Sequence, residues 1–176
     1  MYYGEIKTND IANGEGVRTA LFVSGCTRHC KNCFNQKTWD FCYGTEFTSE
    51  TEEFIFNETK PDWIQGLSIL GGEPMEIQNQ QALLPFLKRF KEKFPNKDVW
   101  LFTGFVFDVD LVKGGQRYTD CTDELLSLID IIIDGRYVEE LHDITLQFRG
   151  SSNQRVIDVK KSLSSKKVVI WEKLRR

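Results

Sequence analysis

The chain has no long hydrophobic run and no apolar N-terminal segment preceded by positive charge. Its longest uninterrupted aliphatic stretch, around Ile131–Ile133, is far too short to cross a bilayer. Internal repeats, low-complexity segments and long linkers are also absent, and 40% hydrophobic with 28% charged residues is typical of a globular protein. We therefore expect a single cytoplasmic domain over residues 1–176, without a membrane segment.

An even set of cysteines, the usual sign of a disulfide framework, is missing as well. The chain has five cysteines, and Cys26, Cys30 and Cys33 fall within eight residues. This crowding favours metal or redox chemistry in a reducing compartment over disulfide bonds. We expect the two remaining cysteines, Cys42 and Cys121, to be free thiols.

The cysteine run also lacks a fourth member. Its spacing, Cys-x3-Cys-x2-Cys, differs from the paired knuckles of structural zinc sites and from ferredoxin runs with a fourth cysteine. Three thiolates can hold a 4Fe-4S cluster but leave one iron without a protein ligand. Because the run directly follows the apolar, β-prone residues Leu21–Gly25, it predicts an active-site loop at a strand end, with the open iron available to a substrate. A zinc site completed by His29 or Cys42 is the alternative interpretation.

Acidic residues are scarce near the C-terminus. Residues 155–176 hold eight Lys or Arg and two acids, a net charge of +6, so residues 1–154 carry −9 of the overall −3. This basic C-terminal extension is interpreted either as a docking element for an acidic partner or nucleic acid, or as a solvated terminus. We favour the solvated terminus and do not expect nucleic-acid binding.

Apolar runs alternate with helical patterns along the chain. Strands are expected at residues 17–24, 67–70, 99–102 and 129–133. Helices are expected from a capping box at Ser49–Glu52 to near Lys60, over Gln78–Phe94 despite Pro85, and over 123–128, with a loop at 110–120. This order predicts an α/β fold, a parallel sheet with flanking helices. A closed eightfold barrel needs about 250 residues, so the shorter chain supports only a partial, open (β/α) barrel with a wide mouth.

The unusual residues follow the predicted strands. They are the cysteine loop, Gly71–Pro74, Thr103–Gly104 and Asp134–Gly135. Because the carboxyl ends of parallel strands meet at one edge of a sheet, we expect these segments to form one ligand site.

The three clustered cysteines and Gly71-Gly72-Glu73-Pro74 together resemble the radical S-adenosylmethionine superfamily. The resemblance extends to one family, the activating proteins of anaerobic ribonucleoside-triphosphate reductase, from about Tyr3 to Asp158. The segments that carry it are, in chain order, Asn13–Arg18, Leu21–Cys26, Cys33–Asn35, Thr38–Trp39, Thr103–Gly104, Asp134–Tyr137 and Arg149–Gln154. Residues 160–176 lie outside the matched motifs.

The resemblance implies a barrel of the radical S-adenosylmethionine type with one 4Fe-4S cluster per chain, held by Cys26, Cys30 and Cys33. It implies that S-adenosylmethionine chelates the open iron and is cleaved reductively to a 5'-deoxyadenosyl radical. That radical would take hydrogen from a glycine in the large glycyl radical subunit of the reductase. The implied electron source is a low-potential donor such as flavodoxin. No catalytic side chain is implied beyond the cluster and the cofactor.

The resemblance also indicates which residues contact the cofactor. Gly71 and Gly72 would let the backbone approach its methionyl part, with Glu73 near its amino group. The remaining expected contacts are Asn32, Cys33, Phe34 and Thr103. Thr103–Gly104 and Asp134 either contact the ribose or the carboxylate of the cofactor or have a turn or helix-cap role. Many superfamily members carry an aromatic residue where this chain has Asn32, so we expect the backbone around Cys33 to contact the adenine. Glu15 also departs from the family pattern, which has proline there.

Some motifs support more than one interpretation. Arg18 either balances negative charge at the site or pairs with an acid, and Arg149–Gln154 is either a partner or cofactor contact or a hydrogen-bonded turn. His29 is expected to shape the cysteine loop or the hydrogen bonding of the cluster rather than to ligate a metal. Alternative functions are activation of another glycyl radical enzyme of the formate-lyase type, a zinc-binding interaction module, and an electron carrier with Cys42 as fourth cluster ligand.

Overall fold

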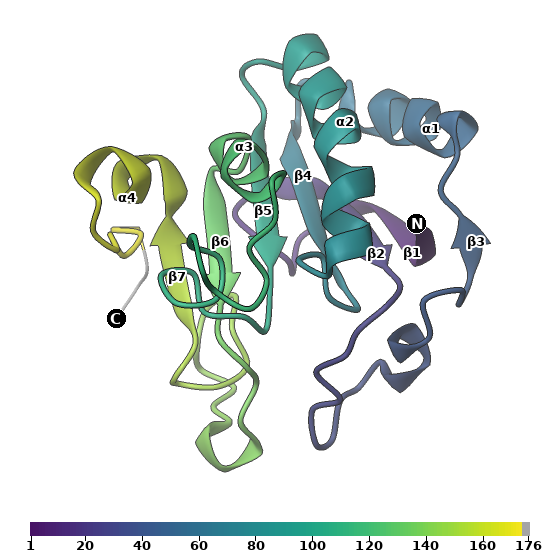
Figure 1. The fold of residues 1–176 in the computed structure, drawn as a ribbon. Helices are drawn as coiled ribbons and strands as arrows, with labels where there is room; N and C mark the ends of the chain where they lie inside the picture. Colours follow the sequence, from purple (N-terminus) through teal and green to yellow (C-terminus); the bar gives the residue numbers. More distant parts are fainter. Residues whose placement is uncertain (174–176) are drawn as a thin grey trace.

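The computed structural model describes residues 1–173, and Leu174–Arg176 lie outside the described residues. Strands and helices alternate along most of this part of the chain (Figure 1). The strands are β1 (Tyr2–Asp10), β2 (Val17–Val23), β3 (Thr45–Glu46), β4 (Ile64–Gly71), β5 (Asp98–Phe102), β6 (Ile131–Asp134) and β7 (Arg155–Asp158). The α-helices are α1 (Ser49–Thr59), α2 (Ile77–Lys93), α3 (Thr122–Ser127) and α4 (Val159–Ser165), with short 3-10 helices η1 (Gln36–Trp39) and η2 (Glu139–Leu141).

One sheet contains all the strands, in the order β3-β1-β2-β4-β5-β6-β7. Its four central strands, β2, β4, β5 and β6, are parallel, as the sequence predicted. The expected parallel sheet is confirmed for these four strands only, because β1, β3 and β7 pair antiparallel at the two sides and make the sheet mixed. The terminal strands β3 and β7 are not paired with each other, so the α/β sheet is open.

The predicted helices are present with small shifts. The first was expected to begin with a capping box at Ser49–Glu52, but the cap is Thr48, whose side chain is paired reciprocally with Thr51. Thr48 and Ser49 are adjacent, and both side chains can cap a helix in the same way, which explains the shift by one position. Pro85 lies inside α2 and does not end it. Residues 110–120 form the expected connection without a strand or α-helix.

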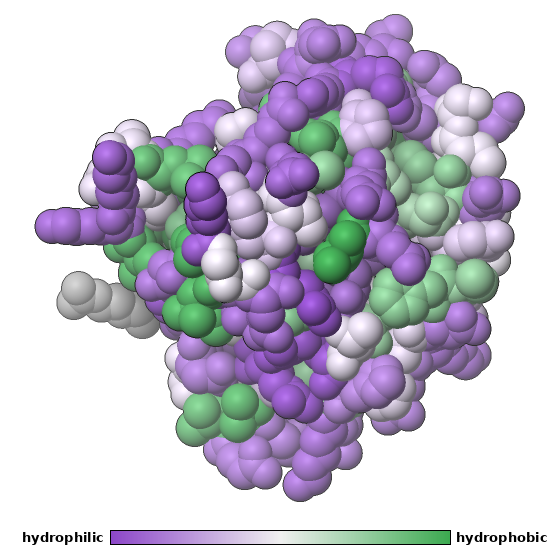
Figure 2. Space-filling view, viewed as in Figure 1, coloured by the Kyte–Doolittle hydropathy of each residue, from purple (hydrophilic) through white to green (hydrophobic). Residues whose placement is uncertain are grey.

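The helices and the sheet form two layers. Side chains from all four helices pack with Leu21, Leu67, Leu101 and Ile132 in the main hydrophobic core, on one face of the sheet. The other face carries Ala20, Phe22, Trp100 and Ile133 and is covered by loops and the C-terminal segment. Figure 2 shows a mainly hydrophilic outer surface with apolar residues in separate patches.

The basic C-terminal segment is part of this structure. Residues 155–158 form β7, and Trp171 reaches the helix-free face of the sheet, where its ring lies 5.1 Å from that of Trp100 and 6.1 Å from that of Phe148. Lys173 pairs with Glu15 at 3.0 Å. The end of the tail, Leu174–Arg176, lies outside the described residues.

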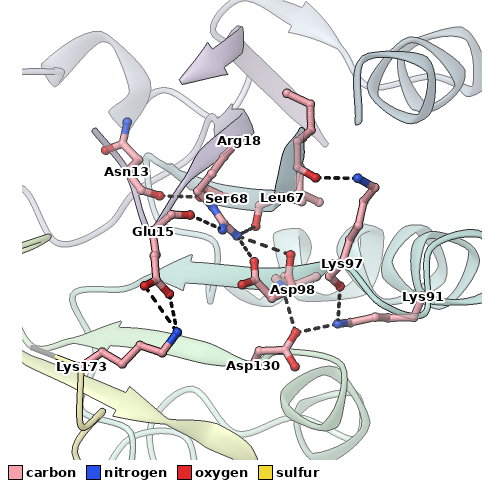
Figure 3. Close-up of polar contacts among 12 residues, drawn as sticks. Asn13, Glu15, Arg18, Leu67, Ser68, Lys91, Lys97, Asp98, Asp130 and Lys173 are labelled. Carbon is pink, nitrogen blue, oxygen red and sulfur yellow. Dashed lines mark hydrogen bonds and ion pairs between the residues drawn. The ribbon is translucent and has the colours of Figure 1, made fainter. Parts of the chain in front are cut away.

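The amino ends of the parallel strands are tied together by Arg18, which is fully buried (Figure 3). Its guanidinium pairs with Asp98 at 2.5 Å and donates to Ser68 Oγ at 2.7 Å and to the Leu67 carbonyl at 3.0 Å. Of the two interpretations of Arg18, the structure therefore shows pairing with an acid, at the edge of the sheet opposite the cysteine loop.

Within residues 1–173, no helix combines the length and the apolar character needed to cross a bilayer.

Candidate functional site

The carboxyl ends of β2, β4, β5 and β6 meet at one edge of the sheet, and a cavity of about 640 Å³ opens there. Val23 pairs with Gly71 and Phe102 with Ile133, so the loops that follow these strands lie side by side. Every residue expected to hold the cluster or the cofactor lines this cavity: Cys26, Cys30, Asn32, Cys33, Phe34, Gly71, Gly72, Glu73 and Thr103. The structure thus brings together all the predicted site residues.

The cysteine loop is fixed at its base. The Gly25 and Cys26 amides donate to the carbonyls of Thr38 and Trp39, at 2.8 and 3.2 Å, which closes the loop on η1. Cys26 is buried, whereas Cys30 and Cys33 are partly exposed. Burial is the main reason that the pKa of the Cys26 thiol rises to about 11. Cluster binding must therefore remove a proton that the free thiol holds tightly.

His29 stacks on a tryptophan within the same loop. Its ring lies 4.5 Å from that of Trp39 at an interplanar angle of 30°, and its backbone φ is +42°. Such a left-handed conformation is uncommon for residues other than glycine. The contact agrees with the expectation that His29 shapes the loop.

A second anchor was not predicted from the sequence. The buried carboxylate of Glu76 accepts from the Thr27 amide at 2.9 Å and from its hydroxyl at 2.5 Å. Arg117 donates to the same hydroxyl at 2.8 Å and lies 3.5 Å from Glu76. The residue after the first cysteine is therefore held by the N-cap residue of α2 and by the loop before α3. The only signal in the sequence was the position of Glu76 two residues beyond the Gly-Gly-Glu-Pro motif.

Gly71 and Gly72 allow two strand ends to touch. A Cβ at Gly71, whose φ is +106°, would lie 2.7 Å from the Val23 carbonyl oxygen and 2.8 Å from the Phe22 backbone. A Cβ at Gly72 would lie 2.7 Å from the Gly25 carbonyl oxygen. Glycine is thus required here by the neighbouring end of β2 and by the Gly25 carbonyl, in addition to any approach of a ligand from the cavity.

Glu73 is buried at the floor of the cavity and is held by three donors. Its carboxylate accepts from the Thr103 hydroxyl at 2.6 Å and from the amides of Met75 and Gly104 at 2.9 and 2.7 Å. Burial raises its pKa to about 7, and these hydrogen bonds oppose the rise. Thr103 therefore positions Glu73, and the pair connects the ends of β4 and β5.

Asn32 and Phe34 lie on the outer part of the loop. Asn32 has a φ of +57°, and the Phe34 side chain is 89% exposed at the mouth of the cavity. Asn79 on α2 connects the inner part of the site, because its amide donates to the carbonyls of Ser24 and Glu73 at 3.0 and 2.9 Å. Sequence reasoning did not identify Asn79.

The Arg149–Gln154 segment forms a hydrogen-bonded turn on the side of the cavity opposite the cysteine loop. Gln154 Oε1 accepts from the amides of Gly150 and Ser151 at 2.9 and 3.1 Å, and Gln154 Nε2 donates to the Gly135 carbonyl at 3.0 Å. Because β7 is antiparallel to β6, the turn that precedes β7 arrives at the same edge as the parallel strand ends. Arg149, Gly150 and Gln154 line the cavity.

Several buried nitrogen donors around the cavity have no partner among the described residues. Those on cavity-lining residues are Arg28 Nε, Trp39 Nε1 and Arg149 Nε. An unsatisfied buried donor costs about 1–3 kcal/mol, so this cavity is suited to a ligand that carries acceptor or anionic groups. Glu73 is the one acid among its described lining residues, which favours such a ligand further.

Other candidate residues have different roles. Asp134 is buried and accepts from Arg155 and from the Phe107 amide, which joins β6 to β7. Cys42 is exposed, Cys121 is partly exposed, and both are free thiols that do not line the cavity. Among the described residues, no three His, Cys, Asp or Glu side chains are grouped to hold a single metal ion.

Comparison with known protein families identifies the general class of this protein. A family model described as a 4Fe-4S single cluster domain matches residues 12–157, most of the chain, and the chain belongs to this class. The chain is 42% identical over 156 residues to the anaerobic ribonucleoside-triphosphate reductase-activating protein of Haemophilus influenzae, covering 88% of this chain and 96% of that protein. More narrowly, it belongs to the family of anaerobic ribonucleoside-triphosphate reductase-activating proteins.

Relatives with the same name occur in other organisms. The activating protein of Escherichia coli K12 is 37% identical over 158 residues, which cover 89% of this chain and 97% of that protein. The activating protein of Enterobacteria phage T4 is 37% identical over 156 residues, which cover 89% of this chain and 93% of that protein. The similarity thus spans nearly the full length of each relative.

Proposed function

We propose that this protein activates an anaerobic ribonucleoside-triphosphate reductase by generating a glycyl radical on its large subunit. The observation that carries the proposal is the single cavity in which the three clustered cysteines, Gly71–Glu73 and Thr103 meet. The names of the relatives support the target, and the matched 4Fe-4S family supports the cluster. The fold is compatible with a partial (β/α) barrel of the radical S-adenosylmethionine type.

The residues present fit the two groups that this chemistry needs. Cys26, Cys30 and Cys33 would hold a 4Fe-4S cluster with one open iron, and the unpaired Arg28 and Arg149 donors suit the carboxylate of S-adenosylmethionine. When bound, these groups supply one-electron cleavage of the cofactor and hydrogen abstraction from the partner's glycine. Thiols that must stay reduced fit action in the cytoplasm.

The chain's own contribution is positioning. Thr27, Glu76 and Arg117 hold the cysteine loop, while Thr103 and Gly104 hold the Glu73 carboxylate against the cavity. A carboxylate with a pKa near 7 is converted to its ionised form by a nearby cation such as the amino group of the cofactor. No general base is required, because a hydrogen atom is transferred once the glycine lies within contact distance.

The decisive experiment uses anaerobically purified protein, dithionite, S-adenosylmethionine and a purified anaerobic ribonucleotide reductase. We expect about four irons with labile sulfide per chain and a glycyl radical signal by electron paramagnetic resonance. Loss of the cluster in Cys26→Ser, Cys30→Ser and Cys33→Ser, and its retention in Cys42→Ser, would identify the three ligands. One zinc without sulfide would instead support an interaction module.

The same assay separates two close alternatives. A glycyl signal on a formate-lyase type enzyme, with none on the reductase, would keep the mechanism and change the partner. Loss of the cluster in Cys42→Ser would make the protein an electron carrier with four cysteine ligands.

A further inference from the structure

The outer side of the cysteine loop carries an unusual concentration of positive charge. Residues 26–39 contain Arg28, Lys31 and Lys37 and no acid, although residues 1–154 as a whole carry a net −9. Lys31 is 76% exposed in its side chain, and Lys37 is also exposed. The loop is therefore a positive segment within an acidic part of the chain.

Two further arginines reach this loop from distant parts of the sequence. Arg117, before α3, donates to the Thr27 hydroxyl at 2.8 Å, and Arg136, after β6, donates to the His29 carbonyl at 3.5 Å. Lys31, Lys37, Arg117 and Arg136 together are named the basic rim. The tertiary fold thus gathers at the cysteine loop cations that are up to 105 positions apart, from 31 to 136.

The basic rim is only partly neutralised within the protein. Glu140 lies 3.7 Å from Lys31, but both side chains are more than 70% exposed, and such a pair contributes little. Arg117 pairs with the buried Glu76 at 3.5 Å, so its charge is largely balanced inside the protein. Lys37 and Arg136 form none of the ion pairs found within residues 1–173, and both side chains are exposed. None of the four rim residues lines the cavity.

We propose that the basic rim is the docking surface for an acidic, low-potential electron-carrier protein. The inference rests on the proposed function, which places an electron-accepting cluster inside this loop. The reductase must reach the cavity, whereas an electron carrier needs only close approach to the cluster. A positive surface that surrounds the cluster ligands and avoids the cavity fits the second partner, because complementary charge steers association and fixes orientation.

The test compares two charge reversals of equal size. Lys31→Glu with Lys37→Glu changes the rim, and Lys166→Glu with Lys167→Glu changes exposed residues at the end of α4, far from the cysteine loop in Figure 1. The cluster-loaded proteins are mixed anaerobically with a purified flavodoxin in its fully reduced form or with dithionite. Stopped-flow absorbance measures the rate of cluster reduction at low and high salt, and titration measures the cluster potential.

With reduced flavodoxin at low salt, we expect the rim variant to react at least about tenfold more slowly than wild type, and the α4 variant to react at the wild-type rate. The difference should shrink at high salt, because screening weakens interactions between exposed charges. Dithionite should reduce both variants at the wild-type rate, and their potentials should agree.

Three results would overturn the proposal. The first is that flavodoxin reduces the cluster at the same rate in wild type and in both variants. The second is that the rim variant is slowed equally with flavodoxin and with dithionite and that its cluster potential is shifted. The third is that the rim variant binds the reductase more weakly while flavodoxin reduces its cluster at the wild-type rate. The dithionite-driven glycyl radical assay on wild-type protein decides the proposed function independently of these rates.

Discussion

At the residue scale, the three expected cluster ligands differ in how accessible they are before the cluster is bound. Cys26 is 8% exposed, and its thiol pKa is raised to about 11, mainly by burial. Cys42, outside the site, is exposed. Since only the thiolate reacts as a nucleophile, burial should protect Cys26 in two ways, by excluding the reagent and by keeping the thiol protonated.

We therefore predict the order of alkylation in the cluster-free, reduced protein. At pH 8, iodoacetamide should modify Cys42 more than about tenfold faster than Cys26, as measured by mass spectrometry of timed samples. Unfolding in urea should remove the difference. Equal rates in the folded protein would mean that Cys26 is not buried before the cluster is inserted.

Glu73 provides a pH-dependent prediction. Its folded pKa of about 7 lies above the ordinary value of 4.5, so folding retains a proton that the unfolded chain releases between these values. Its contribution to stability is complete below pH 4.5 and is lost as pH rises to about 7. Glu73→Gln cannot titrate, so its stability relative to wild type should rise over this window by about 3 kcal/mol.

Urea unfolding of the cluster-free proteins at a series of pH values measures this difference. Glu53→Gln, at a side chain that is 62% exposed, is the matched control and should follow wild type at every pH. A constant difference between Glu73→Gln and wild type across the window would show that the Glu73 carboxyl titrates normally.

At the scale of elements, the C-terminal segment contributes to the helix-free face of the sheet through Trp171. This ring packs edge-on against Trp100 and lies beside Phe148. Trp171→Ala should lower the free energy of unfolding by about 2 kcal/mol, less than a fully buried aromatic residue because Trp171 is half-buried. Trp63→Ala, at a 70% exposed ring, should change it by less than about 0.5 kcal/mol. Urea denaturation followed by circular dichroism compares the two variants with wild type. Equal losses of unfolding free energy in both variants would contradict the packing role of Trp171.

The sequence predicted the central elements because their signals are strong. The apolar runs that became β2, β4 and β5 lie between glycines, prolines and cap residues, so few other assignments fit. It did not predict β1, where Tyr, Glu, Lys and Thr give no clear alternation, or β3 and β7, which have two and four residues. Short edge strands are defined by pairing with a neighbour, and a local pattern does not contain that information.

The site was predictable where residue type determines chemistry. Thiol spacing and Gly-Gly-Glu-Pro identified the cavity from its two most specific segments. Glu76, Asn79 and Arg117 were missed because their roles arise from contacts between distant segments. Thr103 was predicted to contact a ligand, and the structure shows that its hydroxyl holds Glu73.

At the scale of the whole molecule, the cavity is bounded by loops from both halves of the chain. The cysteine loop and Gly71–Gly72 form one side, and residues 146–150 contribute to the other. Hydrogen exchange of the cluster-loaded protein, with and without S-adenosylmethionine, should show added protection in both regions. The edge strand β3, which lies outside the cavity, should be unchanged. Protection confined to the cysteine loop would mean that residues 146–150 do not contact the cofactor.

The Lys173–Glu15 ion pair has a practical consequence. Glu15 precedes β2, whereas the first cysteine follows it, so the seven residues of this strand separate the pair from the cysteine loop. Lys173 therefore offers an attachment point for a spectroscopic label or a surface tether that is separated from the cysteine loop by the length of β2. A protein immobilised through residue 173 would keep the cysteine loop away from the point of attachment, so that an electrode or a soluble partner can approach the loop.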